Sequence, residues 1–426
     1  MIEGDIALVL HAHLPFVRHP EYPEFMEEDW LFEAMTETYL PLLRMMGGLA
    51  DEGLQFQLTM TLSPTLCEML ADPLLQSRYQ RHVTTLIALS EKEVERLAGG
   101  PLEPVARMYL QELTSRIELF EACHGNLLSR FKAFQDSGRL EIITCCATHG
   151  FLPLMLTDEA IRAQLVVAVR NYEKHFDCRP RGIWLAECAW RPGLEPFLAD
   201  AGLRYFFVDT HGITHATPRP VFGTAAPILC PNGVAAFARD PISSAQVWSA
   251  THGYPAHPSY REFYRDLGWD APMEYIRPYL HADGFRRNLG IKYHRITGKV
   301  PLEAKEPYDP AAALATADRH ADDFLYHRQV QIQSLREGIG RSPLLVSPYD
   351  AELFGHWWFE GPVFLERFLR KTLLEQNVIR LVTPGQYLQD NPVQQEATPA
   401  ASTWGRNGHA DVWLNQQNQW IYPYLH

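Results

Sequence analysis

The sequence DIALVLHAHLP, residues 5–15, contains the pattern from which the architecture of the chain can be predicted. Five consecutive apolar residues, 6–10, are followed by histidines at alternate positions, His11 and His13. An apolar run of this length is typical of a strand that is buried on both faces, as in a parallel sheet. Because side chains alternate along a strand, we expect both imidazoles on the same face, where the strand ends.

Six further stretches repeat this pattern of a short apolar run that ends in polar residues. They are rich in Val, Ile, Leu and Phe, and segments with helical spacing, such as residues 361–377, lie between them. Strands that alternate with helices predict an α/β fold built on a parallel sheet. The six stretches are residues 54–64, 139–150, 181–190, 203–212, 233–240 and 342–355.

The polar residues at the ends of these runs form a candidate site. In a β/α barrel the carboxyl ends of the strands open on one mouth, where their side chains converge. Any one of these residues could be a hydrogen-bonded structural residue, but their recurrence over seven strands favours a shared site. The residues are His11, His13, His149, Glu187, Asp209, His211 and Asp350.

Two regions depart from the strand pattern. Residues 64–138 have helical spacing with GG and SG breaks, which predicts a helical subdomain inserted between the second and third strands. Residues 390–426 are polar and contain three tryptophans, and we assign them to a short C-terminal region of helices and loops. The barrel is assigned to residues 1–63 and 139–389.

The composition excludes several classes of protein. The formal net charge of −13 disfavours nucleic acid as a partner, because phosphates would be repelled. Seven cysteines without a CxxC motif indicate buried thiols in a reducing compartment rather than a disulfide framework or a zinc site. No signal-peptide pattern opens the sequence and no apolar run reaches ~18 residues, so we expect a cytoplasmic protein that does not cross a membrane.

Glu187 lies in the apolar stretch IWLAECAW, residues 183–190, where an unpaired carboxylate costs free energy. In a seven-strand barrel it could face Asp350, on the seventh strand, across the mouth. Two carboxylates across a cleft suit glycosidic-bond chemistry, in which one attacks the sugar or activates water and the other protonates the departing oxygen. The alternative is that Glu187 is a buried acid paired with an arginine.

The histidines and several tryptophans each leave two interpretations open. With an acid, His11, His13 and His149 could bind a metal ion, or they could form hydrogen bonds with sugar hydroxyls. Tryptophans in polar surroundings could stack on sugar rings or could simply cover helices. These are Trp30, Trp269, Trp404 and Trp413. The sequence contains no phosphate-binding glycine motif and no GxSxG, so nucleotide and serine-nucleophile sites are not predicted.

Five longer motifs are more specific: HAHLPF (11–16), ATHGFLPL (147–154), WLAECAW (184–190), SPYDAELFGHWWFEGP (347–362) and STWGRNGHADVWLN (402–415). Together they resemble the motif series of glycoside hydrolase family 57, and most closely that of its α-1,4-glucan branching enzymes. The resemblance covers nearly the whole chain. It implies a (β/α)7 barrel with an inserted helical domain, a C-terminal helical region, and a retaining mechanism that uses no metal and no cofactor.

Carried over residue by residue, the resemblance implies that Glu187 is the nucleophile and Asp350 the general acid/base. It places His11, His13, His149 and Trp30 at the donor subsite, Trp269, Trp404 and Trp413 along the glucan, and Arg261 at a further substrate contact. His211, at the end of the fifth predicted strand, completes the expected substrate-binding set.

Two departures from the family pattern bear on the activity. Branching enzymes of the family usually continue well past the VWLN motif, whereas this chain ends at His426, so we expect a shortened C-terminal region. The family also often carries a tyrosine that shields the intermediate from water, but residues 231–246 contain only one aromatic residue, Phe237. Water exclusion decides between transfer and hydrolysis, so this absence bears on the reaction outcome.

We therefore predict a 1,4-α-glucan branching enzyme, which cleaves an α-1,4 bond and forms an α-1,6 branch. One alternative is an amylase-like α-1,4-glucan hydrolase on the same fold. A metal-dependent carbohydrate deacetylase, suggested by the strand-end histidines, is a second. The third is a non-catalytic glucan-binding protein, suggested by the tryptophans and the short C-terminal region.

Overall fold

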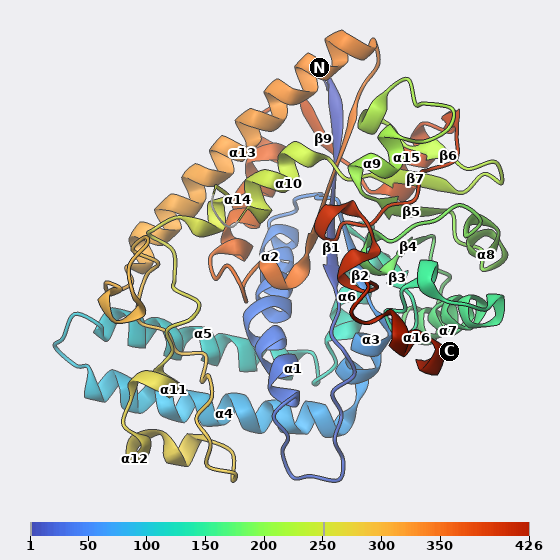
Figure 1. Cartoon of the computed structure of the whole chain (residues 1–426). Coiled ribbons are helices and arrows are strands. Elements are labelled where there is room, and N and C mark those ends of the chain that lie inside the picture. Colours follow the sequence, from blue (N-terminus) through green and yellow to red (C-terminus); the bar gives the residue numbers. More distant parts are fainter. Residues whose placement is uncertain (1, 250–251, 426) are drawn as a thin grey trace.

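The computed structural model describes residues 2–249 and 252–425 and is centred on a curled, mostly parallel β-sheet (Figure 1). The strand order is β10–β6–β7–β5–β4–β3–β2–β1–β8, and β9 pairs with the beginning of β1. The strands are β1 (Gly4–Ala12), β2 (Leu58–Leu62), β3 (Leu140–Cys145), β4 (Gly182–Trp184), β5 (Tyr205–Val208), β6 (Ile228–Leu229), β7 (Ala235–Ala238), β8 (Leu344–Asp350), β9 (Ile379–Leu381) and β10 (Gln395–Glu396).

Seven of these strands coincide with the seven stretches predicted from the sequence, and all seven run parallel. The predicted (β/α)7-type barrel is therefore confirmed. Its two end strands, β7 and β8, form no ladder with each other among the described residues. One backbone hydrogen bond, from the N–H of Asp240 to the carbonyl of Val346 (2.8 Å), joins them instead.

Alternate side chains of β1 enter two different hydrophobic cores. Leu8 packs in the core shared with the surrounding helices, whereas Ala7 and Val9 pack with Val346 and other residues of the barrel interior. Both faces are buried, which explains why the strand is apolar without alternation. Because His11 has the same parity as Ala7 and Val9, its ring is directed into the barrel.

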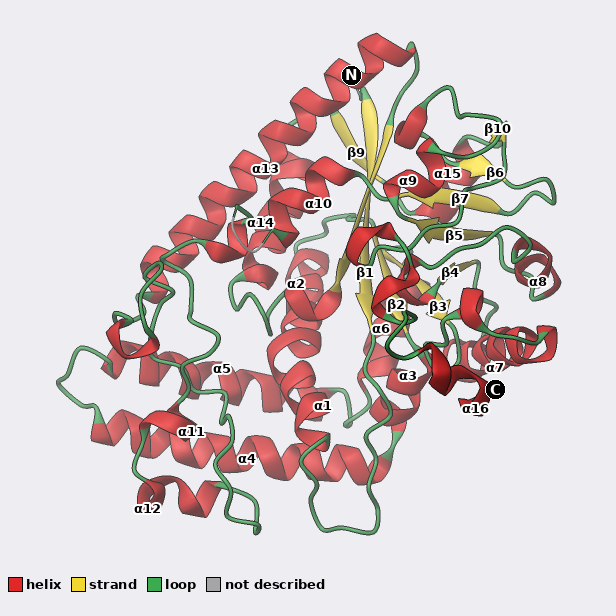
Figure 2. Cartoon of the chain, viewed as in Figure 1, coloured by secondary structure: helices red, strands yellow, loops and turns green. Residues whose placement is uncertain are grey.

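Helices surround the sheet, and the longest, α13, runs along one side of it (Figure 2). Residues 64–138 form four helices, α3 to α6, of which α4 and α5 extend away from the strands (Figure 1). The helices are α1 (Glu28–Ala34), α2 (Leu40–Asp51), α3 (Pro64–Ala71), α4 (Pro73–Arg96), α5 (Glu103–Ala122), α6 (Leu127–Asp136), α7 (Asp158–Phe176), α8 (Glu195–Asp200), α9 (Thr210–Thr214), α10 (Pro241–Trp248), α11 (Leu267–Asp270), α12 (Met273–Ile276), α13 (Pro310–Ile339), α14 (Gly361–Leu374), α15 (Pro384–Asp390) and α16 (Tyr422–Leu425). None of the helices described has both the length and the apolar character needed to cross a bilayer.

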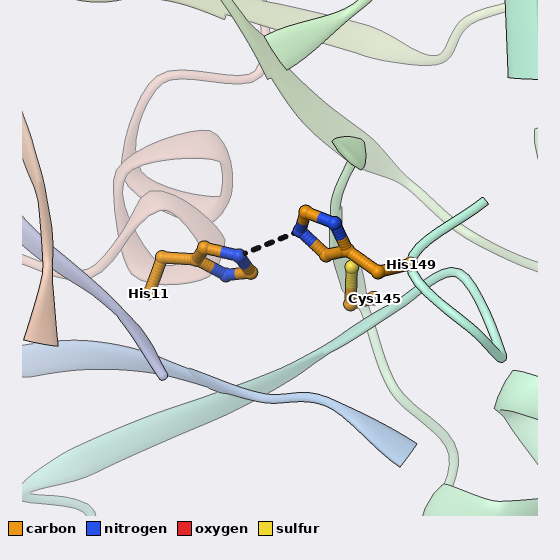
Figure 3. A group of neighbouring side chains, drawn as sticks. All are labelled: His11, Cys145 and His149. Atoms are coloured by element: carbon orange, nitrogen blue, oxygen red, sulfur yellow. Dashed lines mark hydrogen bonds between the residues drawn. The ribbon is translucent and has the colours of Figure 1, made fainter. Parts of the chain in front are cut away.

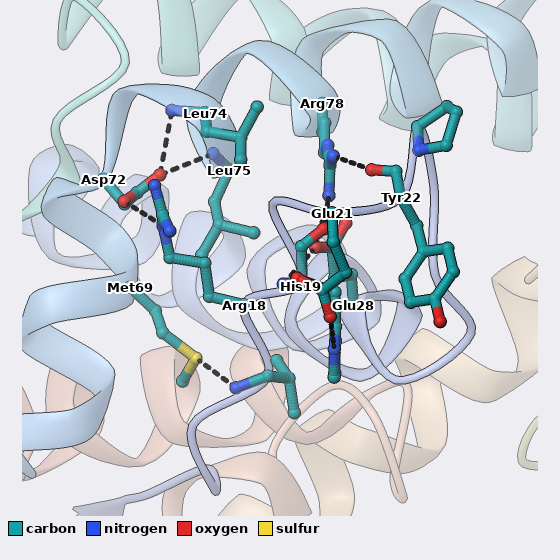
Figure 4. Close-up of polar contacts among 12 residues, drawn as sticks. Arg18, His19, Glu21, Tyr22, Glu28, Met69, Asp72, Leu74, Leu75 and Arg78 are labelled. Atoms are coloured by element: carbon teal, nitrogen blue, oxygen red, sulfur yellow. Dashed lines mark hydrogen bonds and ion pairs between the residues drawn. The ribbon is translucent and has the colours of Figure 1, made fainter.

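The loop between β1 and α1 is anchored to α3 and α4 (Figure 4). Asp72 caps α4 by accepting hydrogen bonds from the N–H groups of its first turn (2.9 and 3.0 Å), and it also forms an ion pair with Arg18 (2.6 Å). Arg78 on α4 forms a buried ion pair with Glu28 (2.5 Å), the first residue of α1. These contacts fix α1, and therefore Trp30, relative to the end of β1.

Candidate active site

The carboxyl ends of the parallel strands surround a cavity of about 660 Å³. It brings together seven of the eleven residues that the sequence assigns to catalysis or substrate binding, which are His11, His13, Trp30, His149, Glu187, Asp350 and Trp404. The other lining residues are Leu14, Glu33, Ala34, Arg239, Trp248, Glu352, His356 and Trp357. The cavity thus combines several carboxyl groups, four histidines and four tryptophans, a lining suited to a polar ligand with flat apolar faces.

Glu187 is held in a strained backbone conformation at the cavity wall. It lies in the 3₁₀ turn η3 (Ala186–Cys188), which follows β4, and its φ and ψ are 60° and 24°. This left-handed region is costly for a residue other than glycine, and such strain is concentrated at functional sites. Trp404 stabilises the turn twice, because its N–H donates to the Glu187 carbonyl and its indole N–H donates to the Glu187 carboxylate (both 3.0 Å).

The segment that carries Trp404 is clamped along the same turn. Ser402 and Trp190 exchange backbone hydrogen bonds (2.8 and 3.1 Å), and the indole of Trp190 donates to the carbonyl of Pro399 (3.2 Å). Trp190 also stacks on Phe206 of β5, with the ring centroids 4.2 Å apart. The C-terminal segment therefore forms part of the wall around Glu187.

Asp350 ends β8 and faces the same cavity. Burial raises the pKa of its carboxyl group well above the ordinary value, and the negative charges of Glu352 and Glu187 raise it further. The pKa of Glu187 is also raised by burial, but the hydrogen bond from Trp404 acts in the opposite direction. Burial therefore favours the protonated form of both groups, and the hydrogen bond from Trp404 opposes this effect at Glu187.

Among the described residues, no lysine or arginine forms an ion pair with Glu187 or Asp350. The nearby Arg239 lies 3.7 Å from Asp209 instead, although its charge partly offsets the raised pKa of Asp350. The alternative in which Glu187 is a buried acid paired with an arginine is therefore wrong. Its carboxylate is left available to a ligand in the cavity.

Three stacked imidazoles form the floor of the cavity. The rings of His13 and His149 are nearly parallel, with centroids 3.8 Å apart, and His11 lies with its Nε2 3.0 Å from Nε2 of His149. Burial lowers the pKa of His13 to about 3 and that of His149 to about 4, and it lowers the pKa of His11 as well. All three rings are therefore neutral at pH 7, and neutral imidazoles both donate and accept hydrogen bonds.

A third carboxyl group, Glu352, lies beside Asp350 and was not predicted from the sequence. It accepts hydrogen bonds from the hydroxyl of Tyr39 (2.5 Å) and from the backbone N–H of His13 (3.3 Å). Burial raises its pKa to about 7. Its position two residues after Asp350, inside the motif 347–362, is the signal that could have identified it.

Other cavity residues were also missed. Arg239 lies at the end of the predicted stretch 233–240, and His356 and Trp357 lie inside the motif 347–362, so their positions in the sequence carried a signal. Glu33 and Trp248 lie on α1 and α10, where no local pattern points to a site.

The other four residues assigned to substrate binding do not line the cavity. Arg261 is buried, and its guanidinium donates to Glu37 and to the hydroxyl of Tyr109 (both 3.2 Å). His211 forms a hydrogen bond through Nε2 with the carbonyl of Gly408 (2.8 Å). The protein contacts of these two residues therefore account for their positions without a ligand.

The other two are tryptophans outside the cavity. Trp269 is 56% exposed and donates its indole N–H to Asn288 (2.9 Å). Trp413 packs against Phe151, with the ring centroids 4.8 Å apart. A role for either ring in binding a long polymer remains a prediction.

A comparison of the sequence with protein families identifies the chain. The family model "Glycosyl hydrolase family 57" matches residues 7–400, which include the ends of all seven parallel strands. The chain belongs to glycosyl hydrolase family 57. Within this family, it is 35% identical to a 1,4-alpha-glucan branching enzyme of Thermococcus kodakarensis over 455 aligned positions. That alignment covers 100% of this chain but 64% of the relative, so the chain spans somewhat less than two thirds of that relative's length.

Two solved structures are similar over almost the whole chain. The alpha-amylase AmyC of Thermotoga maritima is 48% identical, with a TM-score of 0.93 over 99% of this chain and 80% of that one. A branching enzyme of Pyrococcus horikoshii is 34% identical, with a TM-score of 0.86 over 100% of this chain and 77% of that one. Both structural similarities support the barrel fold. One of these proteins is named as an amylase and the other as a branching enzyme, so the two names describe different reactions.

One group of side chains in the described residues could hold a metal ion. The potential ligand atoms of His11, Cys145 and His149 all lie within 4.8 Å of one another (Figure 3). Figure 3 shows the two imidazoles facing each other, with the thiol beside them. No cofactor is implied by the family resemblance, and the carboxyl pair offers acid–base and nucleophilic chemistry without one.

Proposed function

We propose that this chain is a retaining 1,4-α-glucan branching enzyme, a transglycosylase that cleaves α-1,4 bonds and forms α-1,6 bonds. The observation that carries the proposal is the pair of carboxyl groups in one cavity, Glu187 and Asp350, which form no ion pair with a lysine or arginine among the described residues. The branching enzymes among the relatives support the choice of reaction.

In the first step, the ionised carboxylate of Glu187 attacks the anomeric carbon of a glucose unit and the α-1,4 bond breaks. Asp350, whose pKa burial raises, is the proposed acid and transfers its proton to the departing glucan oxygen. The indole N–H of Trp404 orients the attacking carboxylate through its 3.0 Å hydrogen bond. The products are a covalent glycosyl ester on Glu187 and a released chain end.

In the second step, the 6-hydroxyl of another glucan unit attacks the ester carbon. Asp350, now ionised, takes the hydroxyl proton, and Glu187 departs as a carboxylate, so both groups return to their starting states. Two inversions at the anomeric carbon retain its configuration in the new α-1,6 bond.

The remaining cavity residues suit the binding of a glucan. The neutral imidazoles of His11, His13 and His149 form hydrogen bonds with sugar hydroxyls, and aromatic faces such as that of Trp30 stack on sugar rings. His211, Trp269 and Trp413, outside the cavity, are proposed to contact more distant parts of the polymer. Arg261 is proposed to act by holding His356 at the cavity wall, both directly and through Glu37.

A glycogen-type polymer in the cytoplasm is the proposed setting. All seven cysteines are unpaired, and six of them are buried, which supports a reducing compartment.

Hydrolysis is the second candidate, and two observations favour it. The alpha-amylase AmyC shares 48% identity with this chain. Phe237, the one aromatic residue in 231–246, is completely buried in the barrel interior and does not shield the cavity from water. Trp248, Trp357 and Trp404 enclose the cavity instead, so water exclusion in this chain depends on those rings.

An amylose assay distinguishes the two candidates. We expect new α-1,6 bonds, counted after debranching, to exceed the new reducing ends that hydrolysis releases. Asp350→Asn is the control and should lose both products while remaining folded. If wild-type protein releases reducing ends without α-1,6 bonds, the hydrolase replaces the branching enzyme. If the folded wild-type protein yields neither product, both enzyme proposals fail.

A further inference from the structure

Three potential metal ligands, from β1 and from β3 with the turn after it, meet beside the cavity, and the two strands flank β2. His11 lies on β1, Cys145 ends β3, and His149 lies in the turn that follows. The two Nε2 atoms are 3.0 Å apart, and one potential ligand atom from each of the three residues lies within 4.8 Å of the other two (Figure 3). We propose that His11, Cys145 and His149 bind a borderline divalent cation such as Zn²⁺, and that the bound ion prevents glucan from entering the cavity.

The spacing of the donor atoms is close to that of a zinc site. Zinc bonds of 2.0–2.1 Å to nitrogen and 2.3 Å to sulfur in a tetrahedron place neighbouring donors roughly 3.3 to 3.6 Å apart. The 3.0 Å separation of the imidazole nitrogens therefore has to widen by only a few tenths of an ångström. A modest side-chain rotation brings the thiol to the same distance, since all three ligand atoms already lie within 4.8 Å.

The donor set also selects the kind of ion. A thiol with two imidazoles is a soft to borderline set that prefers zinc, cadmium or copper over magnesium and calcium. Binding breaks the S–H bond of Cys145 and forms a metal–sulfur bond, so one proton is released to solvent for each ion bound. The imidazole proton shared between His11 and His149 moves to the other nitrogen of its ring, so both rings remain neutral.

The surroundings point to a reversible, inhibitory ion rather than a resident cofactor. Histidines of resident metal sites usually donate their second ring nitrogen to a carboxylate or a carbonyl, which strengthens the site. The buried Nδ1 of His11 has no such partner among the described residues. The site is therefore weaker than a structural zinc site.

The position of the ion explains the expected inhibition. His11 and His149 line the cavity, whereas Cys145 is completely buried behind them. An ion held by all three occupies the imidazole nitrogens that would otherwise bind sugar hydroxyls, and Glu187 lines the same cavity. This exclusion of glucan rests on the proposed function, whereas the binding of the metal does not.

Cobalt(II) titration tests the metal site directly, because a cobalt–thiolate bond absorbs strongly in the near ultraviolet. A Cys178→Ser background removes the exposed thiol. In this background we expect one cobalt per chain with a thiolate band. Cys145→Ala should abolish the band, whereas Cys146→Ala, which removes the adjacent buried thiol outside the cluster, should keep it.

Two outcomes overturn the metal site. One is a wild-type titration without a stoichiometric thiolate band, which needs no variant to fold. The other is a band that Cys145→Ala retains or that Cys146→Ala also loses in protein with a native circular dichroism spectrum. Cys145→Ser, which keeps the side-chain size, repeats the test if the alanine variant unfolds.

Calorimetry with Zn²⁺ alone and with a maltooligosaccharide tests the exclusion. We expect saturating Zn²⁺ to weaken oligosaccharide binding at least tenfold in the wild-type chain and less than twofold in Cys145→Ala. Equal oligosaccharide affinity with and without Zn²⁺ in the wild-type chain overturns the inhibition. An oligosaccharide that fails to bind even without metal counts against the proposed function instead, while the cobalt result stands.

Discussion

Two glutamates near the cavity, Glu37 and Glu187, are both withdrawn from solvent but have opposite environments. Glu37 is bound by Arg261 (3.2 Å) and by the ring of His356 (2.6 Å), and Arg261 is the main reason that its pKa falls to about 2 despite burial. Glu187 has no cation partner among the described residues, and one side-chain hydrogen bond, from Trp404, holds its carboxylate. Its pKa is raised.

The contrast shows that burial alone does not identify a functional acid, because the partner decides the role. A paired carboxylate such as Glu37 is stable as an ion and contributes to the fold. An unpaired carboxylate such as Glu187 destabilises the fold when it is charged. The hydrogen bond from Trp404 offsets only part of that cost, and a bound ligand could offset more. The arginine pairing considered for Glu187 from the sequence exists in this molecule, but at Glu37.

The largest expected effect comes from removing the charge of Glu187, the glutamate without a cation partner among the described residues. Glu187→Gln should reduce turnover of amylose on the order of 10⁴-fold, because the glycosyl ester can no longer form. The variant should remain at least as stable as the wild-type chain in urea unfolding, since no ion pair is lost. A variant with activity within tenfold of wild type would show that Glu187 is not the nucleophile.

The same substitution at the ion-paired glutamate, Glu37→Gln, should affect stability. It leaves the buried guanidinium of Arg261 without its carboxylate partner, so we expect a loss of about 3–5 kcal/mol in the free energy of unfolding at pH 7. Urea unfolding followed by circular dichroism measures the loss. A change below about 1 kcal/mol would contradict an ion pair of structural importance.

The pH dependence of stability also distinguishes Glu37 from Glu187. Glu37 has a folded-state pKa of about 2 against an ordinary value of 4.5, so its contribution is complete above pH 4.5 and is lost as the pH falls towards 2. The stability difference between wild type and Glu37→Gln should therefore shrink over that range. Glu187 has the opposite sign, because ionising a group with a raised pKa costs stability as the pH rises.

A smaller effect is expected from Trp404→Phe, which removes the indole donor to Glu187. Without this hydrogen bond the pKa of Glu187 rises further. Because the nucleophile must be ionised, the acidic limb of the kcat/KM profile should move to higher pH, with about a tenfold loss at the optimum. Trp413→Phe is the control, since its ring packs on Phe151 rather than bonding to Glu187. An unmoved acidic limb in Trp404→Phe would contradict this role.

The smallest expected effect compares two exposed tryptophans. Trp357, 52% exposed, lines the cavity, whereas Trp269, 56% exposed, lies outside it. Trp357→Ala should raise KM for a short maltooligosaccharide about fivefold, the equivalent of one stacked ring, with little change in kcat. Trp269→Ala should leave that KM unchanged and raise KM only for long chains. Equal effects of both variants on the short substrate would contradict this assignment.

Most of the barrel could be predicted because its seven parallel strands are buried on both faces and are rich in apolar residues. The short strand β4 lies in the longer predicted stretch 181–190. The strands β6, β9 and β10 could not be predicted, since each has two or three residues and pairs with at least one strand far away in the sequence. Ile228–Leu229, for example, pairs with Gln395–Glu396. Segments this short carry no periodicity, and tertiary contacts decide their conformation.

The candidate site was predictable where its residues end strands. Glu187 and Asp350 stand out because acids interrupt apolar runs. Glu33 and Trp248 were missed because helices from elsewhere in the chain bring them to the cavity. Arg261 was assigned to substrate from a local motif, but its partner Glu37 lies 224 positions away, and no local pattern reveals such a pair.

The position of β1 in the sheet has a consequence for the synthesis of the chain. All nine of its residues are buried, and its edge from Asp5 to His11 is paired with Leu344–Asp350. On the ribosome, the apolar first strand therefore emerges long before the strand that covers this edge. An unpaired apolar edge recruits other chains. A cell that makes this protein must keep that edge shielded for most of the translation time.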